Sequence, residues 1–227
     1  YHRLNVDTGA VLGDSCCQDT ATESRMFSKL VEDSIMSWSQ NFKFDAFRFD
    51  LMNLLSRDTL LAARTAVQAV DSDAYFYGEG WNFGPIQSIG ATQSKMAGTE
   101  FSTFSDRQRD GVRNGALFNS DGNRADVDTI RVGLVANLED YVLKDQAGNF
   151  GKLSGFPQSG YAKDPADVVN YVDKHDNETL WDQLQYSLPE TMSASDRARV
   201  HTVAGSFPIL SQGIPFIQMG SDLLRSK

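Results

Sequence analysis

The sequence predicts an α/β fold in which parallel strands alternate with helices that lie outside the sheet. Short apolar segments recur along the chain, and each ends in polar or glycine-rich sequence, as strands of such a sheet do. Segments with helical periodicity separate several of them. The chain has 227 residues, of which 41% are hydrophobic, so it is long enough to bury a sizeable core.

Helices are predicted where apolar residues recur at helical intervals. Thr20 and Glu23 have the spacing of a capping box, and the helix behind them has its apolar positions at Met26, Phe27, Leu30, Val31, Ile35 and Trp38. A second helix is predicted from Leu60, Leu61, Val67 and Val70. A third is predicted to begin near Ser193 and Asp196, with one face formed by Val200, Val203 and Ala204.

The predicted strands are short, and the first is expected to be buried. They comprise residues 42–49, 75–77, 101–104, 168–172 and 214–217. Residues 106–165 are less regular, with a turn predicted at 119–123 and a surface loop at 151–160. No internal repeat or linker is visible, so residues 1–227 are predicted to form one domain.

Three acidic residues follow predicted strands. Asp50 ends the first strand, Glu79 follows the second, and Asp176 follows the strand at 168–172. The separation of Asp50 from Glu79 corresponds to about one βαβ unit. In a (β/α)8 barrel the active site lies at the carboxyl ends of the strands, which is where these carboxylates are predicted to lie.

Charge and hydrophobicity exclude some classes of partner. The chain has 21 basic and 30 acidic residues and a net charge of -9, which argues against nucleic acid and favours a neutral or cationic substrate. No hydrophobic run approaches the roughly 18 residues of a membrane span, so none is predicted.

The two cysteines, Cys16 and Cys17, are adjacent in the sequence. Their Cα atoms lie about 3.8 Å apart across a trans peptide, closer than ordinary disulfide geometry prefers. Two free, buried thiols are therefore favoured over a strained bridge between neighbours.

A pair of carboxyl groups at neighbouring strand ends suits the hydrolysis of glycosides with retention. That reaction needs an ionised carboxylate as nucleophile and a protonated carboxyl about 5 to 5.5 Å away. Strand-end acids taken singly are more often structural, since they cap helices or pair with Arg. Arg48 lies two residues before Asp50, so on a strand both side chains face the same way and Arg48 can favour the charged form of Asp50.

Three short segments carry a more specific signal. They are Phe47-Arg48-Phe49-Asp50-Leu51-Met52, Gly78-Glu79-Gly80-Trp81 and Lys174-His175-Asp176-Asn177. In this order they resemble three signature regions of the α-amylase superfamily, glycoside hydrolase family 13. The Leu51-Met52 continuation and the Gly-Glu-Gly-Trp form resemble the pullulanase and limit dextrinase group. Further matches extend over essentially the whole chain: Tyr1 to Asn5, Cys16-Cys17, Phe104 to Arg107, Asn170 to Val172, Gly213 to Phe216 and Leu223 to Lys227.

The resemblance implies roles for these residues. Asp50 would be the nucleophile, Glu79 the general acid/base, and Asp176 a third carboxylate that orients substrate hydroxyls and stabilises the transition state. Glu79 must carry a proton at the start, which calls for a desolvated site or nearby negative charge. The implied substrate-binding residues are Arg48, Leu51, Trp81, His175 and Asn177, with Trp81 equally well explained as a core side chain.

The implied activity is cleavage of α-1,6-glucosidic branch linkages in pullulan, amylopectin or limit dextrins. Alternatives are a relative with α-1,4 or mixed specificity, a non-catalytic glucan-binding homologue, or an inactive fragment. The mechanism requires no cofactor, and although structural calcium occurs in the superfamily, the sequence has no dense loop of oxygen ligands. Bacterial members are commonly secreted or surface-attached and plant members act in plastids, so a secreted or surface location is the expectation for a bacterial chain.

The sequence also departs from the family pattern. Ala46 and Asn53 stand where glycine is usual, and Leu54-Leu55 replace an aromatic or aliphatic residue followed by His. These changes affect expected contacts with the leaving-side sugar. The family's first signature region is not found, so the chain is expected to supply about strands 4 to 8 of the barrel. The amino-terminal barrel strands are expected in the full-length protein.

Overall fold

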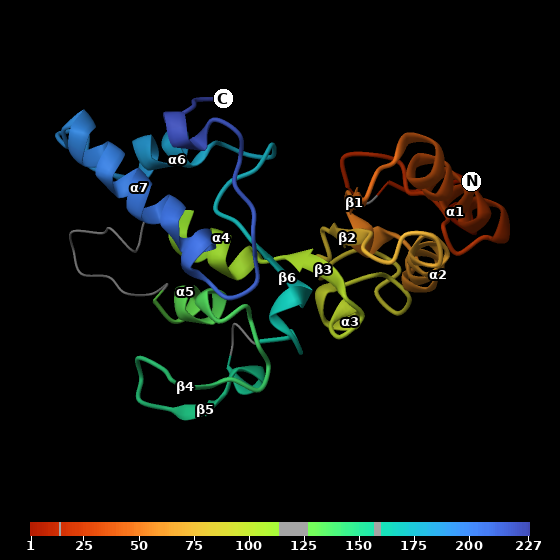
Figure 1. The fold of residues 1–227 in the computed structure, drawn as a ribbon, viewed down its shortest axis with the longest axis horizontal. Helices are drawn as coiled ribbons and strands as arrows, with labels where there is room; N and C mark the ends of the chain where they lie inside the picture. Colours follow the sequence, from red (N-terminus) through yellow and green to blue (C-terminus); the bar gives the residue numbers. More distant parts are fainter. Residues whose placement is uncertain (14, 114–126, 157–159) are drawn as a thin grey trace. The chain divides into compact units, whose positions relative to one another are not determined.

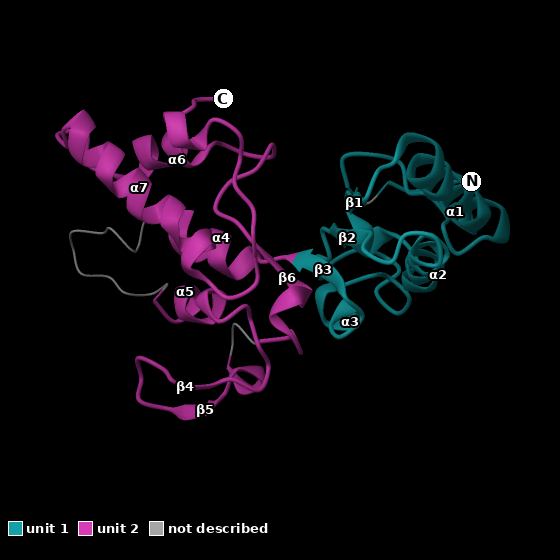
Figure 2. Ribbon diagram, viewed as in Figure 1, with its two compact units in different colours: residues 1–103 teal, residues 104–227 magenta. Residues whose placement is uncertain are grey.

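The computed structural model describes residues 1–13, 15–113, 127–156 and 160–227. They form two compact units, Tyr1–Thr103 and Phe104–Lys227 (Figure 2). Each unit combines helices with parallel strands, which confirms the predicted α/β class. The assignment of residues 1–227 to one domain stays a prediction.

The first unit alternates strands and helices along the chain (Figure 1). Its elements are α1 (Arg25–Phe42), β1 (Ala46–Phe49), a 3-10 turn (Met52–Leu54), α2 (Arg57–Gln68), β2 (Tyr75–Gly78), α3 (Gln93–Met96) and β3 (Phe101–Phe104), whose last residue falls in the second unit. β1 pairs in parallel with β2, and Phe49 lies opposite Gly78. β2 in turn pairs in parallel with β3. The strands predicted at 75–77 and 101–104 are confirmed.

Helix α1 is confirmed, but its predicted start is wrong. The helix begins at Arg25, and the Ser24 hydroxyl accepts the N–H of Phe27 at 3.4 Å. Two residues of the segment 20–23, which contains the predicted capping box, make tertiary contacts instead. The Thr22 hydroxyl accepts the N–H of Ser56 at 2.7 Å, and Glu23 forms an ion pair with Arg3 at 2.9 Å.

Strand β1 is shorter and less buried than predicted. Phe42 still belongs to α1, and Lys43 ends that helix with a left-handed φ of 59°. None of the four residues of β1 is fully buried. Within the first unit β1 pairs with β2 on one side, so it is an edge strand there and only part of its surface is covered.

Aromatic side chains build the core of the first unit. The Phe76 ring lies 5.2 Å from that of Phe47 and 5.6 Å from that of Phe101. Leu60 and Val67 on α2 are fully buried in the same cluster. The core therefore joins α2 to the strands that end at Asp50 and Glu79.

The second unit is mainly helical (Figure 1). Its short strands form two pairs. Its elements are α4 (Asp106–Arg113), α5 (Val127–Leu134), β4 (Val142–Lys144), β5 (Phe150–Lys152), β6 (Val168–Asn170), α6 (Leu180–Ser187), α7 (Ala194–Leu210) and β7 (Ile214–Pro215), with 3-10 turns at Leu153–Gly155, Pro165–Asp167 and Ser221–Leu223. β4 and β5 are antiparallel, whereas β6 and β7 are parallel. A core formed by α4, α5, α6 and α7 contains Val112, Ile130, Leu180, Leu184 and Ala204.

Several predictions for the second unit can be compared with this structure. The predicted start of α7 is confirmed, since the Ser193 hydroxyl accepts the N–H of Asp196 at 3.1 Å. The helices and the hairpin within 106–165 were not predicted. The turn at 119–123 lies outside the described residues, as do residues 157–159 of the predicted loop, whose first residues instead form β5 and a 3-10 turn.

The predicted burial of the cysteines is wrong. Cys16 and Cys17 are free, as predicted, but exposed, because they lie in the loop between Leu12 and Asp19 rather than in the core. Helix α4 is rich in charged residues, and a run of charges of this kind is most often a solvated face. Arg113 is instead buried, and Arg109 donates a hydrogen bond to the Tyr171 hydroxyl at 2.9 Å.

No helix in the part of the chain that the structure describes is long and apolar enough to cross a membrane.

Candidate active site

The strand register of the first unit places two acidic residues at adjoining strand ends. Asp50 directly follows β1 and Glu79 directly follows β2. The Glu79 N–H donates to the carbonyl of Phe49 at 3.1 Å, so the backbone pairing of the two strands continues to the acidic residues. This arrangement follows from the parallel pairing of β1 with β2.

Arg48 links the two acidic side chains. Its Nη1 donates to Asp50 Oδ1 at 2.5 Å, and its Nη2 lies 3.0 Å from Glu79 Oε1. The prediction that Arg48 and Asp50 face the same way is confirmed. The side chain of Glu79 is 2% exposed and that of Asp50 is 61% exposed, so one carboxyl is desolvated and the other is open to solvent. Different surroundings of this kind allow two carboxyl groups to take different chemical roles.

The turn after β1 supplies a further contact to Glu79. Leu51 has φ 41° and ψ 45°, in the left-handed region, and its N–H donates to Glu79 Oε2 at 3.0 Å. Each carboxylate oxygen of Glu79 therefore has a donor group at hydrogen-bonding distance.

The two glycines beside Glu79 are required by close packing. A Cβ at position 78 would lie 2.4 Å from the carbonyl oxygen of Phe49, and one at position 80 would lie 2.9 Å from the backbone nitrogen of Gln93. Any side chain at either position would displace backbone. The Gly-Glu-Gly sequence thus allows β2 to approach β1 closely and fixes the course of the chain on both sides of Glu79.

Asn53 connects the same turn to the loop that carries Trp81. Its backbone N–H donates to the carbonyl of Glu79 at 3.3 Å, and its side-chain amide donates to the carbonyl of Phe83 at 3.0 Å. Trp81 itself is half-buried. Its place among the substrate-binding residues stays a prediction.

The second unit contains the other predicted site residues, in the loop between β6 and α6. Lys174 Nζ donates to Asp176 Oδ2, and His175 Nε2 lies 3.4 Å from Asp176 Oδ1. The side chain of Lys174 is 4% exposed, whereas those of His175 and Asp176 are 60% and 49% exposed. Asn177 is exposed and has a left-handed φ of 59°. The structure thus groups Arg48, Asp50, Leu51 and Glu79 in one unit, and His175, Asp176 and Asn177 in the other.

Comparison with known proteins gives a consistent result. No protein-family model matches the chain. A pullulanase of Klebsiella pneumoniae is 40% identical over an alignment of 259 residues, which covers 100% of this chain and 24% of that protein. A chloroplastic pullulanase of Arabidopsis thaliana is 33% identical and is covered over 28% of its length. A crystal structure of PulA from Klebsiella oxytoca superposes with a TM-score of 0.92 at 39% identity, over 100% of this chain and 24% of that one.

This chain is homologous to a segment of the pullulanases. It spans about a quarter of the length of the curated pullulanases it matches, as the 24% and 28% coverage shows. Glycoside hydrolases of the pullulanase type are thus its relatives, and the resemblance first seen in the short motifs is confirmed over the whole sequence.

Two features of this site were not predicted from the sequence. One is the left-handed turn at Leu51, for which the sequence gives no signal because the residue is not glycine. The other is the pair formed by Lys174 with Asp176. These residues are two apart, and in an extended chain residues two apart have their side chains on the same side. That spacing is the signal from which the pair could have been predicted.

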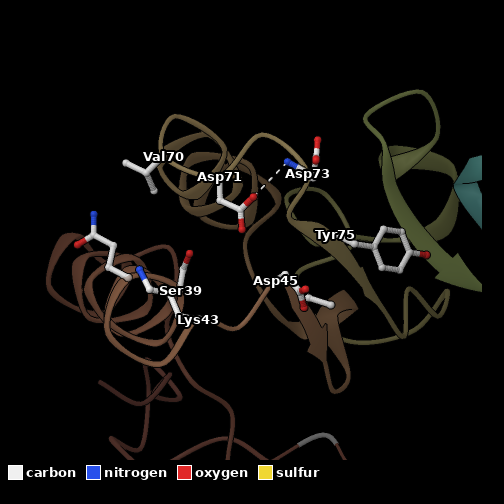
Figure 3. A pocket seen from close by; sticks show the side chains of 9 residues that line it. Ser39, Lys43, Asp45, Val70, Asp71, Asp73 and Tyr75 are labelled. Atoms are coloured by element: carbon white, nitrogen blue, oxygen red, sulfur yellow. Dashed lines mark hydrogen bonds between the residues drawn. The ribbon is translucent and has the colours of Figure 1, made fainter.

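A pocket of about 790 Å³ lies at the other ends of the same strands (Figure 3). Asp45 directly precedes β1, Tyr75 begins β2, and Asp71 and Asp73 complete the acidic part of the lining. Burial raises the pKa of Tyr75 to about 12, so its hydroxyl stays protonated. Ligands of parallel α/β sheets bind at the carboxyl ends of the strands, so we assign this pocket no part in the chemistry.

Among residues 1–13, 15–113, 127–156 and 160–227, no three His, Cys, Asp or Glu side chains are grouped so that they could hold a metal ion.

Proposed function

We propose that the protein containing this chain is a glycoside hydrolase that cleaves α-1,6-glucosidic branch linkages with retention of configuration. The observation that carries the proposal is the Arg48-linked pair of carboxyl groups, one buried and one exposed, at the ends of neighbouring parallel strands. Homology to pullulanases over the whole chain supports the same reaction. In this proposal the chain supplies about strands 4 to 8 of a (β/α)8 barrel.

In the first step Asp50 attacks the anomeric carbon while Glu79 donates a proton to the leaving glycosidic oxygen. The bond from the anomeric carbon to that oxygen breaks, and a covalent glycosyl ester on Asp50 forms. In the second step Glu79 takes a proton from water, which attacks the anomeric carbon and releases Asp50. The exposure of Asp50 supports its role as the group that meets the substrate, and the contacts of Glu79 with Arg48 and with the Leu51 N–H hold the proposed acid/base in place.

The remaining site residues are proposed to bind the sugar. Asp176 orients substrate hydroxyls and stabilises the positive charge that develops on the sugar ring, and His175 and Asn177 donate hydrogen bonds beside it. Trp81 provides an apolar face for stacking, and Arg48 and Leu51 complete the surroundings of the reacting bond. The exposed side chains of His175 and Asp176 are compatible with contact to a ligand.

The proposed substrate is a branched α-glucan or an oligosaccharide derived from one. A pullulanase from Klebsiella pneumoniae that is 39% identical to this chain has been crystallised as a maltotriose complex, and its structure superposes with a TM-score of 0.91. A neutral substrate also fits the net charge of -9. The two-carboxyl mechanism is proposed to need no cofactor, and we propose no calcium site.

The proposal is tested with the full-length protein and pullulan. Release of maltotriose supports cleavage of α-1,6 bonds, whereas release of panose would support the α-1,4-specific alternative. The anomeric configuration of the first product, followed by NMR, reports retention. Trapping with a fluorinated glycosyl donor should label the peptide that contains Asp50, and a label on Glu79 or Asp176 would contradict the assignment of the nucleophile.

A further inference from the structure

The backbone of Leu51 adopts a conformation that is unusual for its residue type. Its φ of 41° and ψ of 45° lie in the left-handed region, where the Cβ of an L-residue crowds the following carbonyl oxygen. The sequence places a leucine there, directly after Asp50, and the chain then enters the 3-10 turn Met52–Leu54. Strained conformations of this kind persist where the surrounding structure holds them, and they cluster at functional sites.

The conformation has a specific geometric result. It directs the N–H of Leu51 to Glu79 Oε2, with a donor–acceptor distance of 3.0 Å. Arg48 Nη2 lies at the same distance, 3.0 Å, from the other oxygen, Oε1. A charged group on one side and a backbone amide on the other therefore distinguish the two oxygens and fix the plane of a carboxyl group that is almost fully buried.

We infer that Leu51 is a positioning residue for Glu79, acting through its backbone rather than through its side chain. Arg48 is also bonded to Asp50 at 2.5 Å, so its guanidinium is shared between the two acids. The Leu51 amide belongs to a turn that is anchored beneath it by the fully buried Met52. The left-handed turn thus sets the orientation from which Glu79 transfers its proton, and small errors in such orientation reduce rates strongly.

The inference rests on the proposed function, because it assigns a task to the proposed acid/base. It makes a distinct prediction, since a misplaced acid affects substrates according to their leaving group. Pullulan needs a proton on its leaving oxygen, whereas the fluoride of a maltotriosyl fluoride leaves without one. The informative quantity is the ratio of kcat/KM on pullulan to kcat/KM on the fluoride.

Two substitutions at the same position separate the backbone from the side chain. Leu51→Val keeps an apolar side chain but disfavours positive φ, because its branched Cβ crowds the backbone there. Leu51→Gly removes the side chain but adopts positive φ readily and keeps the N–H. In the full-length protein we expect Leu51→Val to lower the ratio by about tenfold or more, in the range of general acid catalysis. Leu51→Gly should leave the ratio within about twofold of the wild-type value, even where both rates fall together.

Glu79→Gln is the reference variant, and hydrolysis of the fluoride reports that each variant is folded. A collapsed ratio in Glu79→Gln with an unchanged ratio in Leu51→Val would overturn the inference and leave the proposed function standing. Equal losses on both substrates in Leu51→Val would also overturn it, since they would mean that Leu51 serves binding or packing. An unchanged ratio in Glu79→Gln would overturn the acid role of Glu79 itself, and the inference with it.

Discussion

The two groups of acidic residues are held in different ways. In the first unit, Glu79 is buried, its neighbours Gly78 and Gly80 pack against backbone, and Arg48 bridges it to Asp50. In the second unit, Asp176 is half-exposed on a loop and its main partner is the buried Lys174. In the first group, Arg48 is shared by Asp50 and Glu79. In the second group, the buried Lys174 pairs with the half-exposed Asp176.

The side chains of the two groups are held in position by different parts of the structure. The first is set by strand register and close backbone contacts, so its geometry is fixed before a substrate arrives. The second lies on a loop where the side chains of His175 and Asp176 reach into solvent, and the buried ammonium group of Lys174 pairs with Asp176 from the same loop. Substitutions in the first group should therefore slow the chemical step more than those in the second, whose effects extend to substrate binding and to the local loop structure.

The largest loss of activity is expected when the proposed nucleophile is removed. Asp50→Ala in the full-length protein should lower kcat on pullulan by about 10⁴-fold or more, because no covalent intermediate can form. Asp176→Asn, the matched change in the second group, should cost less, about 10²- to 10³-fold, because it removes charge stabilisation and not the bond-forming atom. Rates with both variants, with thermal unfolding as the control for folding, check this order. Equal losses would mean that the two groups are not chemically distinct.

The next effect tests the close approach of β2 to β1. In Gly78→Ala the new Cβ would lie 2.4 Å from the Phe49 carbonyl oxygen and 2.8 Å from Met52 Sδ, so the strand must shift. We expect a loss of stability of about 1 to 3 kcal/mol, as for overpacked cores, and a large loss of activity. Gly155→Ala in the second unit is the matched control, since a Cβ there meets no atom within 4 Å. A denaturant midpoint for Gly78→Ala equal to that of the control would contradict this account.

A smaller effect on activity is expected when Lys174, the cation of the second group, is replaced. Lys174→Met keeps most of the buried side-chain volume but removes the ammonium group that pairs with Asp176. The freed carboxylate should then hold substrate less well, and we expect KM for pullulan to rise by about tenfold with a smaller change in kcat. Lys152→Met breaks an exposed pair with Asp140 and should change neither constant, because such pairs contribute little. A fall in kcat at constant KM would place Lys174 in the chemical step.

The strand ends of the first unit were predictable because pattern and register act together there. An apolar run followed by a carboxylate, twice within one βαβ unit, is enough to bring Asp50 and Glu79 to adjoining strands. Side chains two residues apart on a strand face the same way, which is why the contact of Arg48 with Asp50 could be predicted.

The features that escaped prediction depend on tertiary contacts. Thr20 has the cap position of the predicted capping box, but it forms an isolated β-bridge with His2 instead, and the N-cap of α1 is Ser24. Helix α4 was missed because charged residues fill it, although Arg113 is buried and bonds to the carbonyl of Glu178 at 3.0 Å. The turn at Leu51 could not be predicted because a left-handed conformation usually requires glycine, and only the contact with Glu79 and the buried turn explain it.

The smallest effect concerns the pH dependence of stability, which should differ between the units. His201 on α7 is 5% exposed and its ring lies 6.1 Å from that of Trp181. Burial lowers the pKa of His201, and the nearby charge of Asp173 opposes this only in part. The other two of the three histidines, His2 and His175, are exposed. A buried imidazole of this kind is therefore a feature of the second unit.

The sign follows from proton binding in the two states. The unfolded chain binds a proton at His201 near the ordinary value of about 6.5, whereas the folded chain binds it only at lower pH. Between these values the unfolded state holds more protons, so stability falls as the pH falls below about 6.5 and is unaffected by this group above it. In the full-length protein, amide exchange corrected for its intrinsic pH dependence should show α7 losing protection at about pH 5 relative to about pH 7, with α2 changing less. His201→Gln should reduce that loss in α7, because its side chain does not titrate, and Asp173→Asn should increase it, because it removes the charge that favours the imidazolium. If the imidazole of His201 titrates by NMR at or above the value of an exposed histidine, the burial argument is wrong and the two units should respond to acid alike.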